Sequence, residues 1–395
     1  MNISINNSST IPFSAISGGD PSSKIFTLGL TESVLQPTSF QTRDLYNNVG
    51  HNTGNLAFHY AINRMIDMVP KSIPWGSKPE DIDACGDLAI MPCANQLGVH
   101  VDLRGLANTF GKIRSRVVAI GLGAQASTNL EIPVLDQNTL DWLQRLVERS
   151  PSKHPNITVR GDFTKRVMDH YGFGDHAISL GCPTLLINKS RDLGAKLEPL
   201  YKRIPRKVAI AAGHPDWKFM RTLESSLVRM MEDTRGAYIV QATDELLAIA
   251  RNDFAYVKPE FLKDLRTYLK LNLGDDQFRD WIREYFISFY DVGSWMEYLR
   301  RFDFVVGARI HGVMLGIQAG IPGLCIAHDS RTMELCQKSK IPYVLAGQVR
   351  DGMVLEDLIS LSNFDGKEFD DNRREISSEY VKFFKNNELP EFSGI

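Results

Sequence analysis

The sequence predicts an α/β protein with two facing domains, each built on a doubly wound, mostly parallel sheet. Short apolar runs alternate with segments of helical periodicity, which is typical of parallel sheets covered by helices on both faces. The 395 residues exceed the usual size of one domain, about 100–200 residues. A basic stretch with two prolines, Asn188–Arg206, interrupts the alternation midway and precedes a new apolar run. Together these observations indicate two Rossmann-like halves with a cleft between them.

The strand candidates are apolar runs of about three to five residues bounded by Gly, Pro or Asn. In chain order they are Asp87–Met91, Arg116–Ile120, Ile157–Val159, Ile178–Leu180, Lys207–Ala211, Tyr238–Gln241, Phe302–Val306 and Gly323–Ala327. Apolar residues recur at the spacing of one helix face over 58–66, 310–317 and 376–384, so helices are expected there. Another helix is expected to begin near Asp136.

The domain organisation follows from these elements. Residues 1–22 are rich in Ser and Asn and are expected to form a flexible leader. Residues 23–195 are expected to form the first Rossmann-like domain and residues 206–365 the second. A C-terminal helix and tail are expected over residues 366–395.

Composition excludes several classes of protein. Lys and Arg number 45 against 47 Asp and Glu, so the formal net charge of −2 argues against a nucleic-acid partner. No apolar run approaches the roughly 20 residues of a membrane span, and the N-terminus does not resemble a signal peptide. The five cysteines and nine histidines form no disulfide framework and no zinc-binding pattern, so no metal is expected. The expected compartment is the reducing cytoplasm.

The main candidate for chemistry is the segment 302–322. In open parallel sheets, ligands bind beyond the carboxyl ends of the strands. Here a buried strand ends at Gly307 and a helix begins at about Arg309, so Arg309 and His311 lie in its first turn beside free backbone N–H groups. The positive end of the helix dipole repels a guanidinium, and the pattern therefore favours an anionic ligand between them. The alternative is a structural Arg paired with a carboxylate of the other domain, and a His that fills a polar gap in the core.

Other strands are also followed by polar or glycine residues. These are Asn95 and Gln96, Gly121–Gln125, Arg160, Gly181, Gly213 and His214, and His328 and Asp329. The run Gly121–Ala126 formally matches a dinucleotide fingerprint, but no helix opens directly from it, so a nicotinamide site is not expected. The segment Asn47–Ile62 looks like a substrate loop before a helix, with Asn55 as the expected N-cap.

Three motifs in the second half resemble the polysaccharide pyruvyl transferase family. They are Gly307-Ala308-Arg309-Ile310-His311-Gly312, Ala319-Gly320-Ile321-Pro322, and Asp329-Ser330-Arg331-Thr332-Met333-Glu334-Leu335. The likeness extends more weakly to Asn52–Asn55, Gly121–Gln125 and Val159-Arg160-Gly161, and so covers about residues 45–345. The family's first loop commonly reads Gly-Asp, whereas this chain has Gly54-Asn55, which removes a carboxylate there.

The resemblance implies two facing Rossmann-like domains in a GT-B-type arrangement, with the acceptor on the first and the donor on the second. It implies transfer of a carboxyethylidene group from phosphoenolpyruvate to two sugar hydroxyls, with release of phosphate and no cofactor. The catalytic residues would be His311 and Arg309, and the donor would be bound by Arg160, Arg309, Gly312 and Arg331. Further substrate contacts would come from Asn52, Gly54, Asn55, Asn95, Gly123, Gln125 and Glu334. The partners would be phosphoenolpyruvate and a saccharide, and a lipid-linked saccharide would bring the protein close to a membrane surface.

Two other functions stay open at this stage. The first is a GT-B glycosyltransferase that uses a nucleotide sugar, in which Glu334 would grip a ribose. The second is a sugar-binding or regulatory protein that kept the fold and lost activity, against which the intact Arg309 and His311 pair argues.

Overall fold

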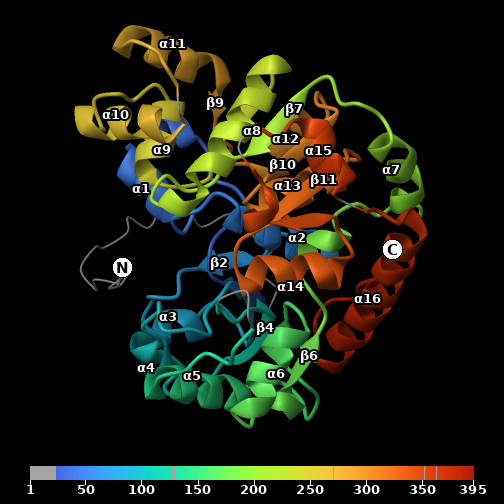
Figure 1. Ribbon diagram of the computed structural model, residues 1–395. Coiled ribbons are helices and arrows are strands. Elements are labelled where there is room, and N and C mark those ends of the chain that lie inside the picture. Colours follow the sequence, from blue (N-terminus) through green and yellow to red (C-terminus); the bar gives the residue numbers. More distant parts are fainter. Residues whose placement is uncertain (1–23, 127–129, 270, 351, 362) are drawn as a thin grey trace.

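Two separate six-stranded sheets form the framework of the molecule (Figure 1). The computed structural model describes residues 24–126, 130–269, 271–350, 352–361 and 363–395, so the leader predicted for residues 1–22 lies outside the described residues. The first sheet has the order β2 (Lys71–Ile73), β1 (Ile25–Leu28), β3 (Leu88–Pro92), β4 (Arg116–Leu122), β5 (Ile157–Val159) and β6 (Ala177–Ser179). The second has the order β12 (Tyr343–Leu345), β11 (Gly323–Ala327), β10 (Phe304–Gly307), β7 (Val208–Ala211), β8 (Ala237–Ile239) and β9 (Phe286–Ile287). All pairs between these strands are parallel, which confirms the predicted fold class.

The order of the second sheet places its switch point between β7 and β10. Numbered along the chain within that sheet, the strands run 6-5-4-1-2-3, which is the Rossmann order read from the other edge. The chain therefore leaves in opposite directions from the two central strands, and a crevice opens beyond their carboxyl ends. The turn with Arg309 and His311 follows β10, and it lies at this crevice.

Helices flank both sheets. In the first part of the chain they are α1 (Thr42–Asn48), α2 (Asn55–Ile66), α3 (Pro79–Asp83), α4 (Arg104–Phe110), α5 (Gln137–Glu148), α6 (Asp162–His170) and α7 (Leu193–Tyr201). The remainder are α8 (Arg221–Asp233), α9 (Asp244–Ala250), α10 (Pro259–Tyr268), α11 (Asp275–Tyr285), α12 (Val292–Leu299), α13 (Ile310–Gln318), α14 (Ser330–Ser339), α15 (Leu355–Ser360) and α16 (Gly366–Asn386). The helices predicted over 58–66, 310–317 and 376–384 are parts of α2, α13 and α16. No described helix has the length and apolar character needed to cross a bilayer.

All eight predicted strands exist, and their ends agree within two residues. Four strands, β1, β2, β9 and β12, were not predicted. Three of these are the outer strands β2, β9 and β12, of two or three residues each. Runs of this length have no period that separates them from a loop, although the equally short β5, β6 and β8 were predicted.

One hydrophobic core extends through both halves. Leu88 and Ile90 on one face of β3 belong to a cluster that includes the residues of the second sheet, whereas Ala89 and Met91 on the other face pack in a separate cluster. This alternation follows from the two-residue period of a strand. The first sheet is therefore buried on both faces, as expected for parallel sheets.

Segments of the chain cross from one half to the other near the N-terminal end. Helix α1 packs beside α9, where Arg43 forms an ion pair of 2.7 Å with Asp244. Arg251 Nη2 donates to the carbonyl oxygens of Pro37 at 3.1 Å and Phe40 at 3.0 Å. Residues ahead of α2 thus lie against the second half, while β1 belongs to the first sheet. The boundaries 23–195 and 206–365 stay predictions.

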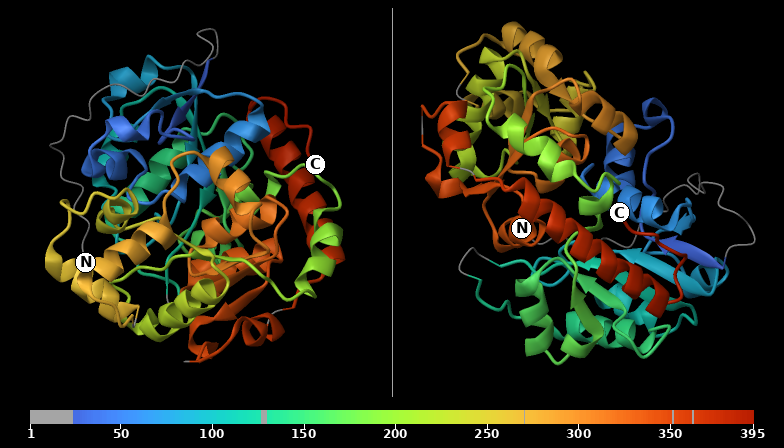
Figure 2. Two further views of the ribbon diagram at one scale, coloured as in Figure 1. Left: turned by 90° about the horizontal axis from the view of Figure 1, so that it is seen from above. Right: turned by 90° about the vertical axis from the view of Figure 1, so that its right-hand side faces the viewer.

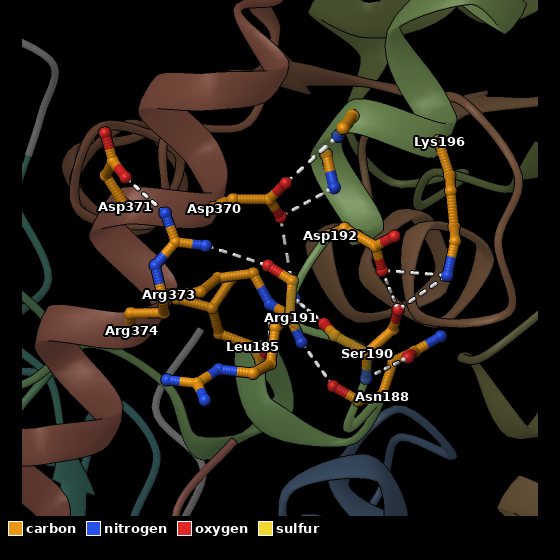
Figure 3. Close-up of polar contacts among 12 residues, drawn as sticks. Leu185, Asn188, Ser190, Arg191, Asp192, Lys196, Asp370, Asp371, Arg373 and Arg374 are labelled. Carbon is orange, nitrogen blue, oxygen red and sulfur yellow. Dashed lines mark hydrogen bonds and ion pairs between the residues drawn. The ribbon is translucent and has the colours of Figure 1, made fainter.

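The C-terminal helix α16 runs alongside both halves and clamps the connection between them (Figures 2 and 3). Arg373 is fully buried and donates to the carbonyl oxygens of Leu185 at 3.1 Å, Ser190 at 2.8 Å and Asn188. Asp370 lies 3.8 Å from Arg373 and accepts from the N–H groups of 194 and 195 at the start of α7, at 2.7 and 3.0 Å. The backbones meet where a Cβ on residue 194 or 366 would overlap the other segment, so both positions require glycine. These contacts fix the first residues of the predicted interdomain connection.

Replacing Arg373 should therefore destabilise the whole molecule. We expect Arg373→Met to cost about 3–5 kcal/mol, because it leaves the buried Asp370 without its cation and three carbonyl groups, that of Leu185 buried, without this donor. Unfolding in urea, followed by tryptophan fluorescence, measures the loss. Arg374→Met is the matched control, since Arg374 pairs with Asp371 at the surface, and it should change stability by less than about 1 kcal/mol. Equal effects of the two variants would contradict a buried clamp.

Candidate active site

The central element of the candidate site is the turn between β10 and α13. Gly307 has a φ of 156°, and a Cβ there would overlap the backbone of Ala211 on the neighbouring strand, so this position requires glycine. Arg309 follows as the N-cap, with extended backbone angles and no capping side chain, and α13 begins at Ile310. Its first N–H groups and the dipole of a nine-residue helix point toward the crevice.

The Arg309 guanidinium is held in place by an aromatic ring rather than by a carboxylate. Its central carbon lies 4.8 Å from the centroid of the Trp217 ring. The Nε and Nη2 atoms are buried and have no hydrogen-bond partner among the described residues. Burial, and then the nearby charge of Arg331, lowers the pKa of Arg309 to about 10. This residue therefore keeps two N–H donors for a ligand.

His311 is held in the neutral state by its surroundings. Its Nε2 atom lies 3.7 Å from Cys182 Sγ, and its ring centroid lies 5.5 Å from that of Phe58. Burial lowers the pKa of His311 well below 6.5, and the charges of Arg160 and Arg331 lower it further. An added proton on His311 would be favoured only once negative charge enters the site.

Arg160 reaches the same place from the first sheet, and much of its hydrogen-bonding capacity is already used. The side chain is buried, with Nε donating to the Gly121 carbonyl at 2.9 Å and Nη2 to the Cys93 carbonyl at 3.2 Å. A Cβ on Gly123 would lie 2.8 Å from Arg160 Cδ, so glycine there makes room for this side chain. Arg160 thus joins the carboxyl ends of β3 and β4 and adds a buried positive charge near His311.

Arg331 is the third guanidinium of the site. Its Nη2 lies 3.3 Å from Asp329 Oδ2, and its Nε is buried without a hydrogen-bond partner. Burial opposes ionisation of Asp329, but Arg331 and His328 outweigh it and lower the pKa of this carboxyl to about 2. In the described part of the chain, Arg331 has a carboxylate within 4.0 Å, whereas Arg160 and Arg309 have none. The site therefore carries more positive than negative charge.

The loop before α2 packs directly against this turn. Thr53 N donates to the Gln241 carbonyl at 3.0 Å, and a Cβ on Gly54 would lie 3.3 Å from that of His311. The side chain of Gln241 lies beside Gly312, since a Cβ added to Gly312 would be 2.7 Å from Gln241 Nε2. Glycines on both sides of Gln241 thus allow the predicted substrate loop to approach the turn closely.

The prediction that Asn55 caps α2 is wrong. Gly54 is the N-cap residue, and Asn55 is the first residue of the helix. Asn55 Nδ2 donates to the carbonyl oxygens of Val49 at 3.1 Å and Gly50 at 2.9 Å. Asn52 instead closes the turn, because its Oδ1 accepts from Gly54 N at 2.8 Å. Both asparagines shape the loop.

The remaining predicted site residues lie on the first half or between the halves. Asn95 donates to Gln125 and contacts His100 Nε2 at 3.0 Å, beyond the ends of β3 and β4. Glu334 has both oxygens bonded to Thr164, to its N–H at 2.6 Å and its hydroxyl at 2.8 Å. Glu334 therefore contacts the first half of the protein itself. The loop after Gly123 does not open into a helix, because α5 begins at 137 with Asp136 as its N-cap, as predicted.

Three further side chains lie at this site: Trp217, Cys182 and His328. His328 was named only as a residue that follows a strand, without a role, and Trp217 and Cys182 were not predicted site residues. Cys182 is buried in the core, but its sulfur faces His311. The His328 side chain is 5% exposed, and its ring centroid lies 4.4 Å from that of Trp217. The rule that finds Arg309 also finds His328, which directly follows β11, and it could have selected Cys182, which follows β6 closely. Trp217 lies too far beyond β7 for this rule. In the parts of the chain that the structure describes, no three His, Cys, Asp or Glu residues are grouped to hold a metal ion.

Solved structures of similar architecture include UDP-GlcNAc 2-epimerase from Methanocaldococcus jannaschii, with 10% identity over 90% of this chain and 99% of that chain, at a TM-score of 0.41. A second is the S. aureus MnaA–UDP structure, with 9% identity over 91% of this chain and 97% of that chain, at a TM-score of 0.42. A comparison with curated protein sequences gives no significant match. The family model described as polysaccharide pyruvyl transferase matches residues 52–330, more than two thirds of the chain, from the loop beside His311 to the start of α14. The chain belongs to the polysaccharide pyruvyl transferase family.

Proposed function

We propose that this protein transfers a carboxyethylidene group from phosphoenolpyruvate to a sugar of a polysaccharide or its precursor. The product is a pyruvate ketal, and inorganic phosphate is released. The observation that carries the proposal is the group of three guanidinium groups around His311. Arg160 is fully buried, and the partly buried Arg309 and Arg331 have buried N–H groups without a partner. Phosphoenolpyruvate has a carboxylate and a phosphate on adjacent atoms, and it supplies acceptors that fit such donors.

Arg309 and Arg331 are the main candidates for gripping this donor. A buried N–H group that stays unpaired costs about 1–3 kcal/mol, so an anion that satisfies Arg309 Nε and Nη2 recovers that free energy. Trp217 holds the guanidinium plane of Arg309, which prepares its two-pronged geometry before the ligand arrives. Arg160 contributes mainly charge, because two of its N–H groups already bind backbone carbonyls.

His311 is suited to proton transfer once the donor is present. The donor's negative charges would raise the pKa of the imidazole, which the empty site holds low. The protonated ring would then give its proton to the methylene carbon of phosphoenolpyruvate, and C2 would become an oxocarbenium-like centre. One sugar hydroxyl attacks C2 and gives its proton to His311, which is neutral again after the first transfer. The C–O bond to phosphate then breaks, and a second hydroxyl closes the ketal, its proton leaving with the phosphate.

The departing phosphate would be stabilised by the start of α13. Free N–H groups of the first turn and the helix dipole favour a dianion at this point. Gly312 allows close approach here, since a side chain at that position would meet Gln241. The leaving group therefore develops its charge beside Arg309 and this helix terminus.

The acceptor would enter from the first half. Asn95 and Gln125 lie beyond the strand ends of the first sheet, and amide groups of this kind bind sugar hydroxyls. A lipid-linked saccharide would bring the protein to a membrane surface. The five free cysteines suit a reducing compartment, so we propose that the reaction takes place in the cytoplasm.

A nucleotide-sugar glycosyltransferase fits the site less well. In that alternative Glu334 would bind a ribose, but both of its carboxylate oxygens already accept hydrogen bonds from Thr164. The exposed part of Trp217 is also limited, because Arg309, His214 and His328 pack around its ring. Neither group is therefore free to hold a nucleoside in this arrangement.

Phosphate release tests the reaction directly. We expect purified protein to release phosphate from phosphoenolpyruvate only when a suitable glycan is present, and to add the mass of a carboxyethylidene group to that glycan. The activity should survive EDTA, because arginine side chains neutralise the donor. Mass spectrometry of the acceptor is the readout. Activity that needs added Mg²⁺, or that appears with nucleotide sugars alone, would contradict the proposal.

Binding and proton transfer should separate in two variants. Arg309→Lys keeps the charge but loses the two-pronged geometry, and should weaken phosphoenolpyruvate binding by about 1.5–3 kcal/mol. His311→Asn should lower turnover by roughly 10²–10⁴-fold while the donor still binds. Isothermal titration and steady-state rates measure the two effects, with melting curves as a check on folding. A folded His311→Asn variant with near wild-type turnover would remove His311 from the mechanism.

Donor binding should also take up a proton at His311. The imidazole is neutral near pH 7 in the empty site, because its pKa is lowered, and the anionic donor raises that pKa. Titration calorimetry in two buffers of different ionisation enthalpy measures the protons exchanged. The donor phosphate can itself release protons, so the informative quantity is the difference between the wild type and His311→Asn. We expect the wild type to take up more protons, and an equal value in both proteins would contradict this account.

A further inference from the structure

The first turn of α14 connects the two halves of the protein beside the donor site. Helix α14 follows β11 of the second sheet, yet it packs against α6 of the first half (Figure 1). We propose that Glu334 is a positioning residue: it fastens α14 to the start of α6 and thereby holds Arg331 in the donor site. This inference rests on the proposed function, because it assigns Arg331 to donor binding.

The contact between Glu334 and Thr164 is buried and uses both oxygens of the carboxylate. Glu334 is 3% exposed and Thr164 is fully buried. Oε1 accepts from Thr164 N at 2.6 Å, and Oε2 accepts from Thr164 Oγ1 at 2.8 Å. The same hydroxyl accepts from Ala124 N at 3.0 Å, which links the contact to the loop after β4. The carboxylate also sits in the first turn of α6, where the helix dipole favours negative charge.

A second pair of hydrogen bonds fastens the start of the same helical turn. Ala126 N donates to Ser330 Oγ at 2.9 Å, and Ser330 N donates to the Ala126 carbonyl at 3.2 Å. Arg331 lies between Ser330 and Glu334 in the sequence, so both sides of its turn are bound to the first half. The position of Arg331 relative to Arg160 therefore depends on these contacts, although Arg331 belongs to the second half of the chain.

Glu334 also packs closely against Gly161, the N-cap residue of α6. A Cβ at this position would overlap the side chain of Glu334. The backbone of Gly161 is extended, with φ of 174°, so space rather than conformational freedom requires glycine here. The residue next to Arg160 in the first half is thus shaped to receive Glu334.

The decisive experiment is a double-mutant cycle between Glu334 and Arg331. We expect Glu334→Ala and Arg331→Met each to weaken phosphoenolpyruvate binding by roughly 10- to 100-fold. The double variant should be little weaker than Arg331→Met alone, because Glu334 acts through Arg331. Additive losses would show that Glu334 contacts the ligand itself and would overturn the proposal. Glu334→Gln, which keeps the size and one acceptor, should recover most of the affinity.

Controls separate this role from a general loss of structure. Lys338 and Asp162 also connect the two halves, but this pair is 3.9 Å apart and partly exposed, so Lys338→Met should leave affinity unchanged. If Glu334→Ala does not fold, Thr164→Val serves in its place, because it removes the hydroxyl contact at nearly constant volume. This variant should weaken phosphoenolpyruvate binding, and the double variant with Arg331→Met should again be little weaker than Arg331→Met alone.

Inorganic phosphate is titrated in parallel, since its binding reports on Arg331 even if phosphoenolpyruvate is not the donor. Unchanged phosphate affinity in both Glu334→Ala and Thr164→Val would overturn the proposal, whatever the reaction is.

Discussion

The constraint on which this structure depends is the gathering of three guanidinium groups where the carboxyl ends of two parallel sheets face each other, with Arg160 fully buried and Arg309 and Arg331 partly buried. Bringing like charges out of water is costly, and each side chain meets that cost differently. Arg160 binds two backbone carbonyls, Arg331 pairs with Asp329, and Arg309 lies on the ring of Trp217. Two of these arrangements leave N–H groups unsatisfied, since Arg309 and Arg331 retain buried donors without partners among the described residues. The fold therefore stabilises a site that an anion would complete.

This constraint also explains why glycine occurs at so many points around the site. Gly123 makes room for Arg160, Gly161 for Glu334, and Gly312 for Gln241. In each of these three cases a Cβ would overlap or crowd a polar side chain that serves the site, whereas Gly121 and Gly307 have positive φ angles, of 82° and 156°, that themselves favour glycine. Close packing of polar groups, more than turn geometry, sets the positions of these glycines. The two halves can then approach until their side chains interdigitate.

Much of the fold could be predicted because buried parallel strands and their flanking helices have strong periodic signals. The turn with Arg309 and His311 was predictable for the same reason, since a strand end followed by a helix start defines its position. Strands of two or three residues have no period that separates them from a loop, so β5, β6 and β8 were found whereas the outer strands β2, β9 and β12 were missed. The contacts of Glu334 could not be read from spacing, because tertiary packing sets its partner: Thr164 lies 170 positions from Glu334 in the chain. Asn55 instead binds carbonyl groups five and six residues back, so the conformation of its loop decides its role. Trp217 was missed since it lies well beyond the end of its strand.

Burial, together with the same excess of positive charge, lowers the pKa of His311 and keeps it neutral. Under the proposed reaction, this neutral state links acid catalysis to donor binding. An imidazole next to Arg160 and Arg331 holds a proton poorly while the site is empty. Under the proposed reaction, the anion that fills the guanidinium cluster is also the molecule that must be protonated. The ring therefore becomes an effective acid only when its substrate is present, and a neutral sugar alone cannot bring this about. Under the same proposal, moving Arg331 away from the site would weaken both effects at once, since its charge would bind the donor and it lowers the pKa of His311. The proposed fastening of α14 to the first half would then set affinity and proton transfer through the same side chain.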